Sequence, residues 1–176
     1  MNTVVLVAIA EEIPNILRHQ DNVFLTGVGK VNAALTAATV IAMHKPKLVI
    51  NFGTAGGITV GKGLHECTEF VQRDMLCTDL GFAPGQTPYE DIIKLGAPGL
   101  TCSSGDNFVS NPNLELPADV VDMEAYAIAK ACHNNKIEFR CFKYVTDSAD
   151  ANAGHDWTQL VSQGESYYIE KLKQFS

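Results

Sequence analysis

The sequence lacks the features that are typical of proteins that bind nucleic acids or membranes. Its densest basic stretch holds only Lys171 and Lys173, and the formal net charge is −7. Nucleic acids and anionic membranes both attract clustered Lys and Arg, so neither is an expected partner. No apolar run approaches the roughly 20 residues that span a bilayer, and no basic segment precedes the first apolar run as in a signal peptide. We therefore expect a cytoplasmic protein.

The sequence also lacks paired cysteines. Its five cysteines are odd in number, and none forms a C-x-x-C pair: Cys67, Cys77, Cys102, Cys132 and Cys141. A disulfide framework or a zinc site would need closer, paired spacings, and the histidines have no partner at ligand spacing. We predict buried, reduced thiols, no metal and no cofactor.

What the chain does contain is typical of a globular α/β protein. Hydrophobic residues make up 46% of its 176 residues and charged residues 19%, which is too apolar for a disordered chain. No internal repeat and no linker rich in Gly, Ser or Pro divides it, so we expect one domain over residues 1–176.

Apolar runs predict strands that alternate with helices. The expected strands cover residues 3–10, 22–26, 47–52, 67–72, 101–103 and 139–145. One helix is expected to begin near residue 11, and three further helices are expected over residues 30–44, 123–133 and 157–175. This alternation predicts a single-domain three-layer α/β/α fold with a central mixed, mostly parallel sheet.

Two glycine-rich segments need separate interpretations. Gly27-Val28-Gly29 precedes a helix, but Asn32 stands where a dinucleotide-binding fold has its third glycine, so we interpret it as a turn. Residues 53–57 lack the Lys-Ser/Thr ending of a phosphate-binding loop. Their backbone could still approach a ligand closely, although a tight turn after the third strand is an equal alternative.

Polar or glycine-rich groups follow four of the predicted strands, at residues 11–12, 53–57, 104–107 and 146–150. Ligands of such sheets bind at the carboxyl ends of the strands, so these segments predict one site. Three of its acids are Glu12, Glu124 and Asp147. A lone acid in a first helical turn is usually a favourable dipole contact. Several acids at one edge favour acid–base chemistry, because burial can raise one pKa while another group stays ionised.

These segments resemble a known superfamily. The chain contains AIAEEI (8–13), GVGKVNAALTAATVIAMHKPKLVINFGTAGGI (27–58), SGDNFV (104–109), VDMEAYAIAKACH (121–133) and TDSAD (146–150). In this order they resemble the nucleoside phosphorylase/nucleosidase superfamily, and most closely the bacterial methylthioadenosine/S-adenosylhomocysteine nucleosidases. The resemblance implies hydrolysis of the N-glycosidic bond of an adenine nucleoside.

The resemblance also implies roles for individual residues. Glu12 would activate the attacking water, and Asp147 would protonate N7 of the purine. The substrate-binding residues would be Thr54 and Gly56 beside the water and sugar, Phe108 and Val109 at the base, Met123 and Glu124 at the ribose, and Lys143, which stands where relatives carry an arginine. Thr54 stands where relatives usually carry serine.

The sequence leaves two features of the reaction open: whether water or phosphate is the nucleophile, and which group the substrate carries at its 5′ position. Phosphorylases hold phosphate with several arginines, whereas only Arg18 lies near Glu12, so hydrolysis is favoured. The chain is shorter than its relatives around residues 88–100, beside a loop that in the family completes a neighbouring subunit's pocket, here Leu80, Phe82 and Pro88. We therefore expect a homodimer. The alternatives are a phosphate-dependent phosphorylase, an enzyme of futalosine or another purine nucleoside, and a non-catalytic nucleoside-binding module.

Overall fold

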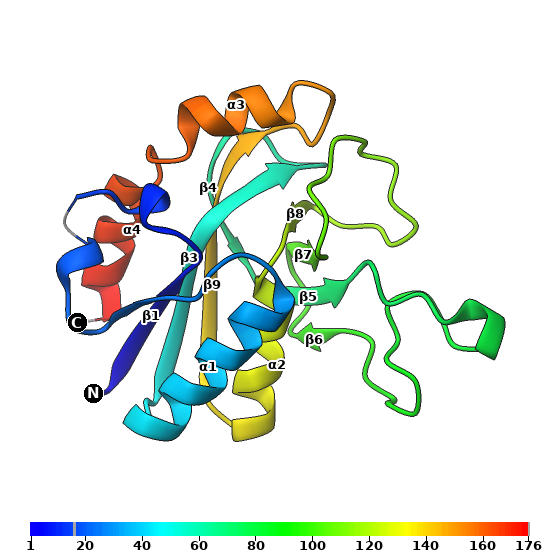
Figure 1. Cartoon of the computed structure of the whole chain (residues 1–176), viewed down its shortest axis with the longest axis horizontal. Helices are drawn as coiled ribbons and strands as arrows, with labels where there is room; N and C mark the ends of the chain where they lie inside the picture. Colours follow the sequence, from blue (N-terminus) through cyan, green and yellow to red (C-terminus); the bar gives the residue numbers. More distant parts are fainter. Residues whose placement is uncertain (16, 176) are drawn as a thin grey trace.

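The structure is a computed structural model that describes residues 1–15 and 17–175. These residues form one nine-stranded sheet flanked by helices (Figure 1). The strands are β1 (Thr3–Val7), β2 (Val23–Leu25), β3 (Leu48–Gly57), β4 (Gly63–Cys67), β5 (Glu69–Gln72), β6 (Leu95–Gly96), β7 (Thr101–Ser104), β8 (Val120–Asp122) and β9 (Glu138–Asp147). The α-helices are α1 (Lys30–His44), α2 (Ala125–Asn135), α3 (Ala153–Leu160) and α4 (Glu165–Leu172). Short 3-10 helices cover Ala10–Glu12, Leu17–His19, Thr78–Leu80 and Lys173–Phe175.

The sheet is mixed and mostly parallel, which confirms the predicted fold class. Its spatial order is β2-β1-β3-β8-β7-β5-β6, and β9 pairs with β3 and β4. The β3–β8, β4–β9 and β5–β6 pairs are antiparallel, and the remaining pairs are parallel. The central strand β3 therefore contacts β1, β8 and β9, and its carboxyl end lies at the middle of the sheet.

Strand β1 shows how the layers are held together. Val4 and Leu6 pack in a cluster with α1 and α2, whereas Val5 and Val7 pack in another cluster with α4. All four side chains are fully buried. Because side chains alternate across a strand, a continuously apolar run supplies both faces of a covered sheet. Each such burial contributes about 1.5–3 kcal/mol, so this short strand attaches helices to both faces.

Helix α1 has the predicted bounds. It begins after Gly29, whose φ of 93° is rarely adopted by other residues, and the backbone N–H of Lys30 donates to Asp106 Oδ1 at 2.7 Å. It ends at His44, where Lys45 is left-handed and Pro46 cannot continue the hydrogen-bonding pattern. Gly27 also has a positive φ, as expected for the predicted turn.

Strand β3 is longer than the sequence suggests. The turn considered at residues 53–57 does not form, because β3 continues through Gly57. Glycine is needed there for close packing: a Cβ on Gly57 would lie 2.3 Å from the carbonyl oxygen of Val60. The segment is thus a strand whose small residues leave room for its neighbours.

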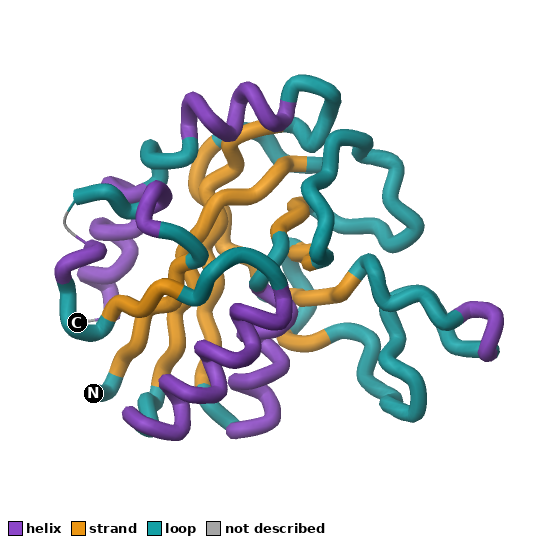
Figure 2. Tube along the Cα trace, in the orientation of Figure 1, coloured by secondary structure: helices purple, strands orange, loops and turns teal. Residues whose placement is uncertain are grey.

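Two of the predicted elements are divided in the structure. The C-terminal helix expected over 157–175 is two helices, α3 and α4, and α3 begins four residues earlier. The strand expected over 67–72 is divided between β4 and β5 at Thr68. Figure 2 shows that the segment between β5 and β7 is mainly loop and extends away from the sheet. None of the described helices is long and apolar enough to cross a membrane.

Candidate active site

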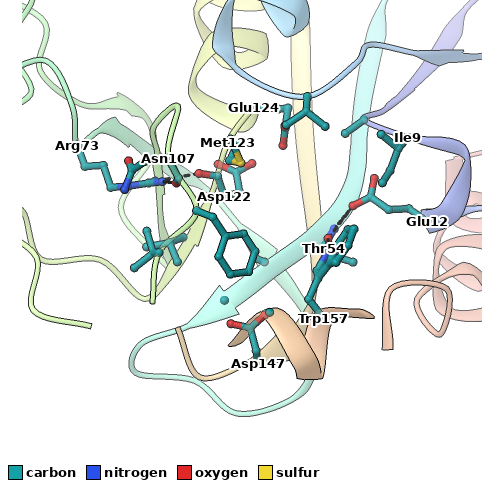
Figure 3. Close-up of a pocket in the computed structure, with 18 residues that line it drawn as sticks. Ile9, Glu12, Thr54, Arg73, Asn107, Asp122, Met123, Glu124, Asp147 and Trp157 are labelled. Carbon is teal, nitrogen blue, oxygen red and sulfur yellow. Dashed lines mark hydrogen bonds between the residues drawn. The ribbon is translucent and has the colours of Figure 1, made fainter. Parts of the chain in front are cut away.

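A cavity of about 330 Å³ opens at the carboxyl end of β3. Its walls come from all four segments predicted to converge, and Figure 3 shows their side chains facing one space. The lining residues are Ala8, Ile9, Glu12, Val28, Thr54, Ala55, Gly56, Arg73, Asn107, Phe108, Val109, Val121, Asp122, Met123, Glu124, Asp147, Gly154 and Trp157. Of the predicted site residues, only Lys143 is outside this set.

Glu12 is a buried carboxylate with one free oxygen. It lies in the 3-10 helix after β1 and is 3% exposed. Its Oε1 accepts hydrogen bonds from the backbone N–H and the hydroxyl of Thr54, both at 2.7 Å, whereas Oε2 is buried without a partner among the described residues. Burial raises the pKa of Glu12, and the Thr54 bonds and the charge of Lys143 oppose that rise. A carboxylate with one oxygen fixed and one free can hold a water molecule.

Lys143 lies behind the cavity wall. Its side chain is 1% exposed, and its Nζ is 2.8 Å from Asp122 Oδ2. A Cβ on Gly53 would lie 3.1 Å from Lys143 Nζ and 3.5 Å from Glu12 Oε1, so a glycine lets these charges approach each other. Direct contact between Lys143 and a ligand was expected; instead, the structure gives the lysine a buried carboxylate partner.

Asp122 holds the other end of this ion pair and helps to shape the cavity. Burial alone would raise the pKa of Asp122. The charge of Lys143 and hydrogen bonds from Lys143, Ser104 and Ala125 outweigh burial, so the pKa is lowered. Asp122 is therefore a fixed negative charge beside Glu124, the next acid along the chain.

Glu124 precedes α2 and is 7% exposed. Its Oε1 accepts a hydrogen bond from the backbone N–H of Gly29 at 2.9 Å. Burial, followed by the negative charge of Asp122, raises its pKa to about 7. With Met123 beside it on the wall, Glu124 can accept hydrogen bonds from ligand hydroxyls when it is ionised.

Asp147 reaches the cavity because of a β-bulge. Ala55 pairs with Val145, but Gly56 pairs with Asp147, so Thr146 is an extra residue in β9. A Cβ on Gly56 would lie 2.9 Å from Asp147 Oδ1, which explains the glycine at this position. Burial raises the pKa of Asp147, although hydrogen bonds from Thr146 and Ala149 oppose the rise. Asp147 is thus disposed to carry a proton.

The loop after β7 supplies Asn107, Phe108 and Val109 to the cavity. Arg73 holds this loop: its Nη2 donates to the carbonyls of Gly105 and Asn107 at 3.2 and 2.6 Å. Its Nη1 donates to the carbonyls of Ser103 and Asp122 at 2.5 and 2.8 Å. This role could not be predicted from the sequence, because the acceptors are backbone groups of segments distant from Arg73.

Trp157 is a second lining residue that sequence reasoning missed. It projects from α3, and its indole N–H donates to the Thr54 hydroxyl at 3.0 Å. It is the only tryptophan in the chain. That rarity was the one available signal, but it did not indicate which residue Trp157 contacts.

Comparison with known proteins decides the family. Residues 5–94 and 102–174 match the family described as the phosphorylase superfamily. The 5′-methylthioadenosine/S-adenosylhomocysteine nucleosidase of Actinobacillus succinogenes is 31% identical over 165 residues, which cover 77% of this chain and 71% of that protein. The chain belongs to this nucleosidase family of the phosphorylase superfamily. The nucleosidase of Staphylococcus haemolyticus is 29% identical and covers 84% of this chain and 78% of its own length.

Solved structures of the family have the same fold. The nucleosidase of Neisseria meningitidis, crystallised with methylthio-immucillin-A, has a TM-score of 0.81 and 25% identity, with 94% of each chain covered. A mutant nucleosidase of Helicobacter pylori with 5′-methylthioadenosine in its active site has a TM-score of 0.86 and 20% identity, covering 98% and 96% of the two chains. The futalosine hydrolase of H. pylori is as similar in fold, with a TM-score of 0.87 and 19% identity, covering 98% and 96%.

Among the described residues, no group of three or more His, Cys, Asp or Glu side chains is arranged to hold a metal ion. All five cysteines are free thiols. Four carboxyl side chains line the cavity: Glu12, Asp122, Glu124 and Asp147.

Proposed function

We propose that the chain hydrolyses the N-glycosidic bond of an adenine nucleoside and releases adenine. The substrate class is that of 5′-methylthioadenosine, S-adenosylhomocysteine and 5′-deoxyadenosine. One observation carries the proposal: a carboxylate with a free oxygen, Glu12, and a carboxyl with a raised pKa, Asp147, line the same cavity. Membership of the nucleosidase family supports the same reaction.

Asp147 acts as the general acid. Adenine leaves poorly as an anion, so protonation of N7 is needed to draw electrons out of the glycosidic bond. Burial raises the pKa of Asp147, which favours the protonated form that this transfer needs. An aspartic acid suits a 6-aminopurine, because its second oxygen can accept from the exocyclic amine while the first donates to N7.

Glu12 acts as the general base. As the bond to adenine breaks, the sugar carbon gains cationic character, as in glycoside hydrolysis. Water bound at the free Oε2 of Glu12 gives up a proton as it attacks that carbon, while Oε1 stays fixed by Thr54. General acid and base assistance each contribute about 10²–10⁴ in rate.

The remaining lining residues bind the substrate. Glu124 accepts hydrogen bonds from the ribose hydroxyls, and Met123 packs against the sugar. Phe108, which is half exposed, stacks on the base, and the backbone of Val109 contacts its edge. Thr54 and Gly56 border the water and the sugar. Lys143 assists from behind the wall, because its positive charge favours the ionised form of Glu12.

Water is a better nucleophile candidate than phosphate. Arg73 is the one arginine among the described lining residues, and both of its terminal nitrogens donate to backbone carbonyls. Lys143 is likewise paired with Asp122. A phosphate ion would require cationic donors that are free to contact it, so the engaged cations support hydrolysis.

We further propose that the chain is a single-domain cytoplasmic homodimer. Val31, Leu35 and Met43 are 68%, 64% and 70% exposed. They are four and eight residues apart along α1, so they lie along one side of the helix and form an apolar stripe. Leu76 and Leu80, in the segment that extends from the sheet, are also more than half exposed. A second copy of the chain would bury both surfaces and bring the extended segment near a neighbouring site. The free thiols are consistent with a reducing compartment.

A substrate panel tests the function. The purified protein is incubated with methylthioadenosine, S-adenosylhomocysteine, 5′-deoxyadenosine, adenosine, inosine and futalosine, each with and without phosphate. We expect adenine release from the adenine nucleosides at a rate independent of phosphate, with the free sugar as co-product. Formation of a sugar 1-phosphate would instead identify a phosphorylase, and binding without turnover would identify a nucleoside-binding module.

A further inference from the structure

Three elements meet in a short hydrogen-bond chain beside the cavity. The indole N–H of Trp157 on α3 donates to Thr54 Oγ1 on β3 at 3.0 Å, and Thr54 Oγ1 lies 2.7 Å from Glu12 Oε1. Figure 3 shows Trp157, Thr54 and Glu12 next to one another along one wall. We propose that Trp157 is a positioning residue, whose N–H fixes the direction in which the Thr54 hydroxyl donates and so orients Glu12. This role rests on the proposed function.

The chemistry of the three groups gives the chain a single direction. An indole nitrogen is only a donor, whereas a hydroxyl has one hydrogen and two acceptor lone pairs. Thr54 Oγ1 must therefore accept from Trp157, and its one hydrogen is left for Glu12 Oε1. A hydroxyl that accepts one hydrogen bond becomes a better donor in the next. The indole thus strengthens a bond that favours the ionised carboxylate.

This chain of hydrogen bonds also determines which oxygen of Glu12 is free. Oε1 receives the hydroxyl of Thr54 and, at 2.7 Å, its backbone N–H. Oε2 is buried and receives no hydrogen bond from the part of the chain that the structure describes. Without the indole, the hydroxyl of Thr54 could rotate to other acceptors, and Glu12 would lose one of its two restraints. Trp157 therefore affects the base without contacting it.

Trp157 also lines the cavity, so its two roles must be separated experimentally. Because it is the only tryptophan, a tryptophan-auxotrophic host supplied with benzothienylalanine replaces this position alone. That analogue keeps the bicyclic shape and has sulfur in place of the N–H. A Trp157→Phe variant provides a second, genetic version of the same change, and thermal unfolding establishes that each protein is folded.

The readout is the pH dependence of kcat and KM for methylthioadenosine. We expect both replacements to move the acidic limb of the kcat/KM profile to higher pH, because Glu12 would lose support for its ionised form. We also expect kcat to fall by about 3–10-fold, which is the effect of one neutral hydrogen bond. KM should change less than about twofold for the analogue, because its shape is retained. In a Thr54→Val background, the same replacement should cause no further shift of the limb.

Thr158→Val is the matched control. It removes a donor from the same helix, but its hydroxyl donates to the carbonyl of Gly154 and not to Thr54 or Glu12, so the limb should not move. An unmoved limb in the analogue, or an equal further shift in the Thr54→Val background, overturns the inference while leaving hydrolysis intact. If the unmodified protein releases no base from any nucleoside, the proposed function itself fails.

Discussion

Lys143 and Asp122 form a fully buried ion pair: their charged atoms are 2.8 Å apart and each side chain is 1% exposed. Breaking such a pair leaves one charge buried and uncompensated, which costs about 3–5 kcal/mol. We therefore expect Lys143→Met to destabilise the protein by that amount in chemical denaturation. Restored stability in Lys143→Met/Asp122→Leu would show that the lone charge caused the loss.

The same pair predicts a pH dependence of stability. The pKa of Asp122 is lowered in the folded state, so its contribution is present above the unfolded pKa of about 4 and is lost as the pH falls through the folded value. Denaturation of the wild type and of Asp122→Asn should show a difference in stability that narrows in acid. An equal difference at every pH would contradict this.

The raised pKa of Glu124 predicts that its contribution to stability decreases as the pH rises. Its folded pKa is about 7, above the unfolded value of about 4.3. Its favourable contribution is therefore complete below the unfolded pKa and is lost as the pH rises through about 7. Glu124→Gln mimics the protonated form, so its stability relative to wild type should increase from about pH 5 to pH 8. Thermal unfolding across that range measures the trend.

The proposed base predicts the effect of an isosteric substitution. Glu12→Gln should lower kcat by about 10²–10⁴ and change KM little, because the amide cannot take a proton from water. Its neighbour Glu11 is exposed, so Glu11→Gln is the matched control and should retain full activity. Steady-state kinetics of adenine release decide the matter, and an active Glu12→Gln protein would refute the mechanism.

The proposed acid can be bypassed by the substrate. Asp147→Asn should lower kcat for methylthioadenosine by about 10²–10⁴. An adenine nucleoside methylated at N7 already has the positive charge that protonation would supply, so the variant should hydrolyse it with a much smaller loss. Glu138→Gln, at the exposed opposite end of β9, serves as control. Equal losses for both nucleosides would mean that Asp147 does not protonate N7.

The apolar stripe on α1 predicts a change of assembly. Leu35→Glu places a charge in the stripe and should convert a dimer into a monomer without unfolding it, because Leu35 is 64% exposed in the single chain. Sedimentation velocity measures the mass, with Gln174→Glu as a charge-matched control. A wild-type protein that sediments as a monomer would contradict the proposed homodimer.

Much of the fold was predictable because its signals are local. Helix α1 is fixed by the preceding glycine, an alanine-rich sequence and Pro46, and β1 by its apolar run. The extent of β3 was not predictable, because Gly53 and Gly56 are required by the side chains of Lys143 and Asp147, which are distant in the sequence. The break between α3 and α4 is similar: a Cβ on Gly164 would lie 2.5 Å from the Tyr168 hydroxyl.

The candidate site was predictable in part for the same reason. Glu12, Glu124 and Asp147 follow or precede regular elements, so the general rule for strand ends brings them to one edge. The contacts of Arg73, Lys143 and Trp157 depend instead on tertiary structure. The partner of each of these residues lies at least 21 positions away in the chain, so the sequence alone does not identify it.

The extra residue in β9 determines which side of the sheet carries the acid. If β9 paired regularly, with no bulge at Thr146, Asp147 would lie opposite Gly57 instead of Gly56. Neighbouring residues of a strand point to opposite sides of the sheet, so the side chain of Asp147 would then point the other way. A β9 of the same length that paired regularly through Asp147 would keep every named side chain but turn the proton donor to the opposite side of the sheet. The capacity for catalysis thus depends on the pairing register of the backbone as much as on the identity of any amino acid.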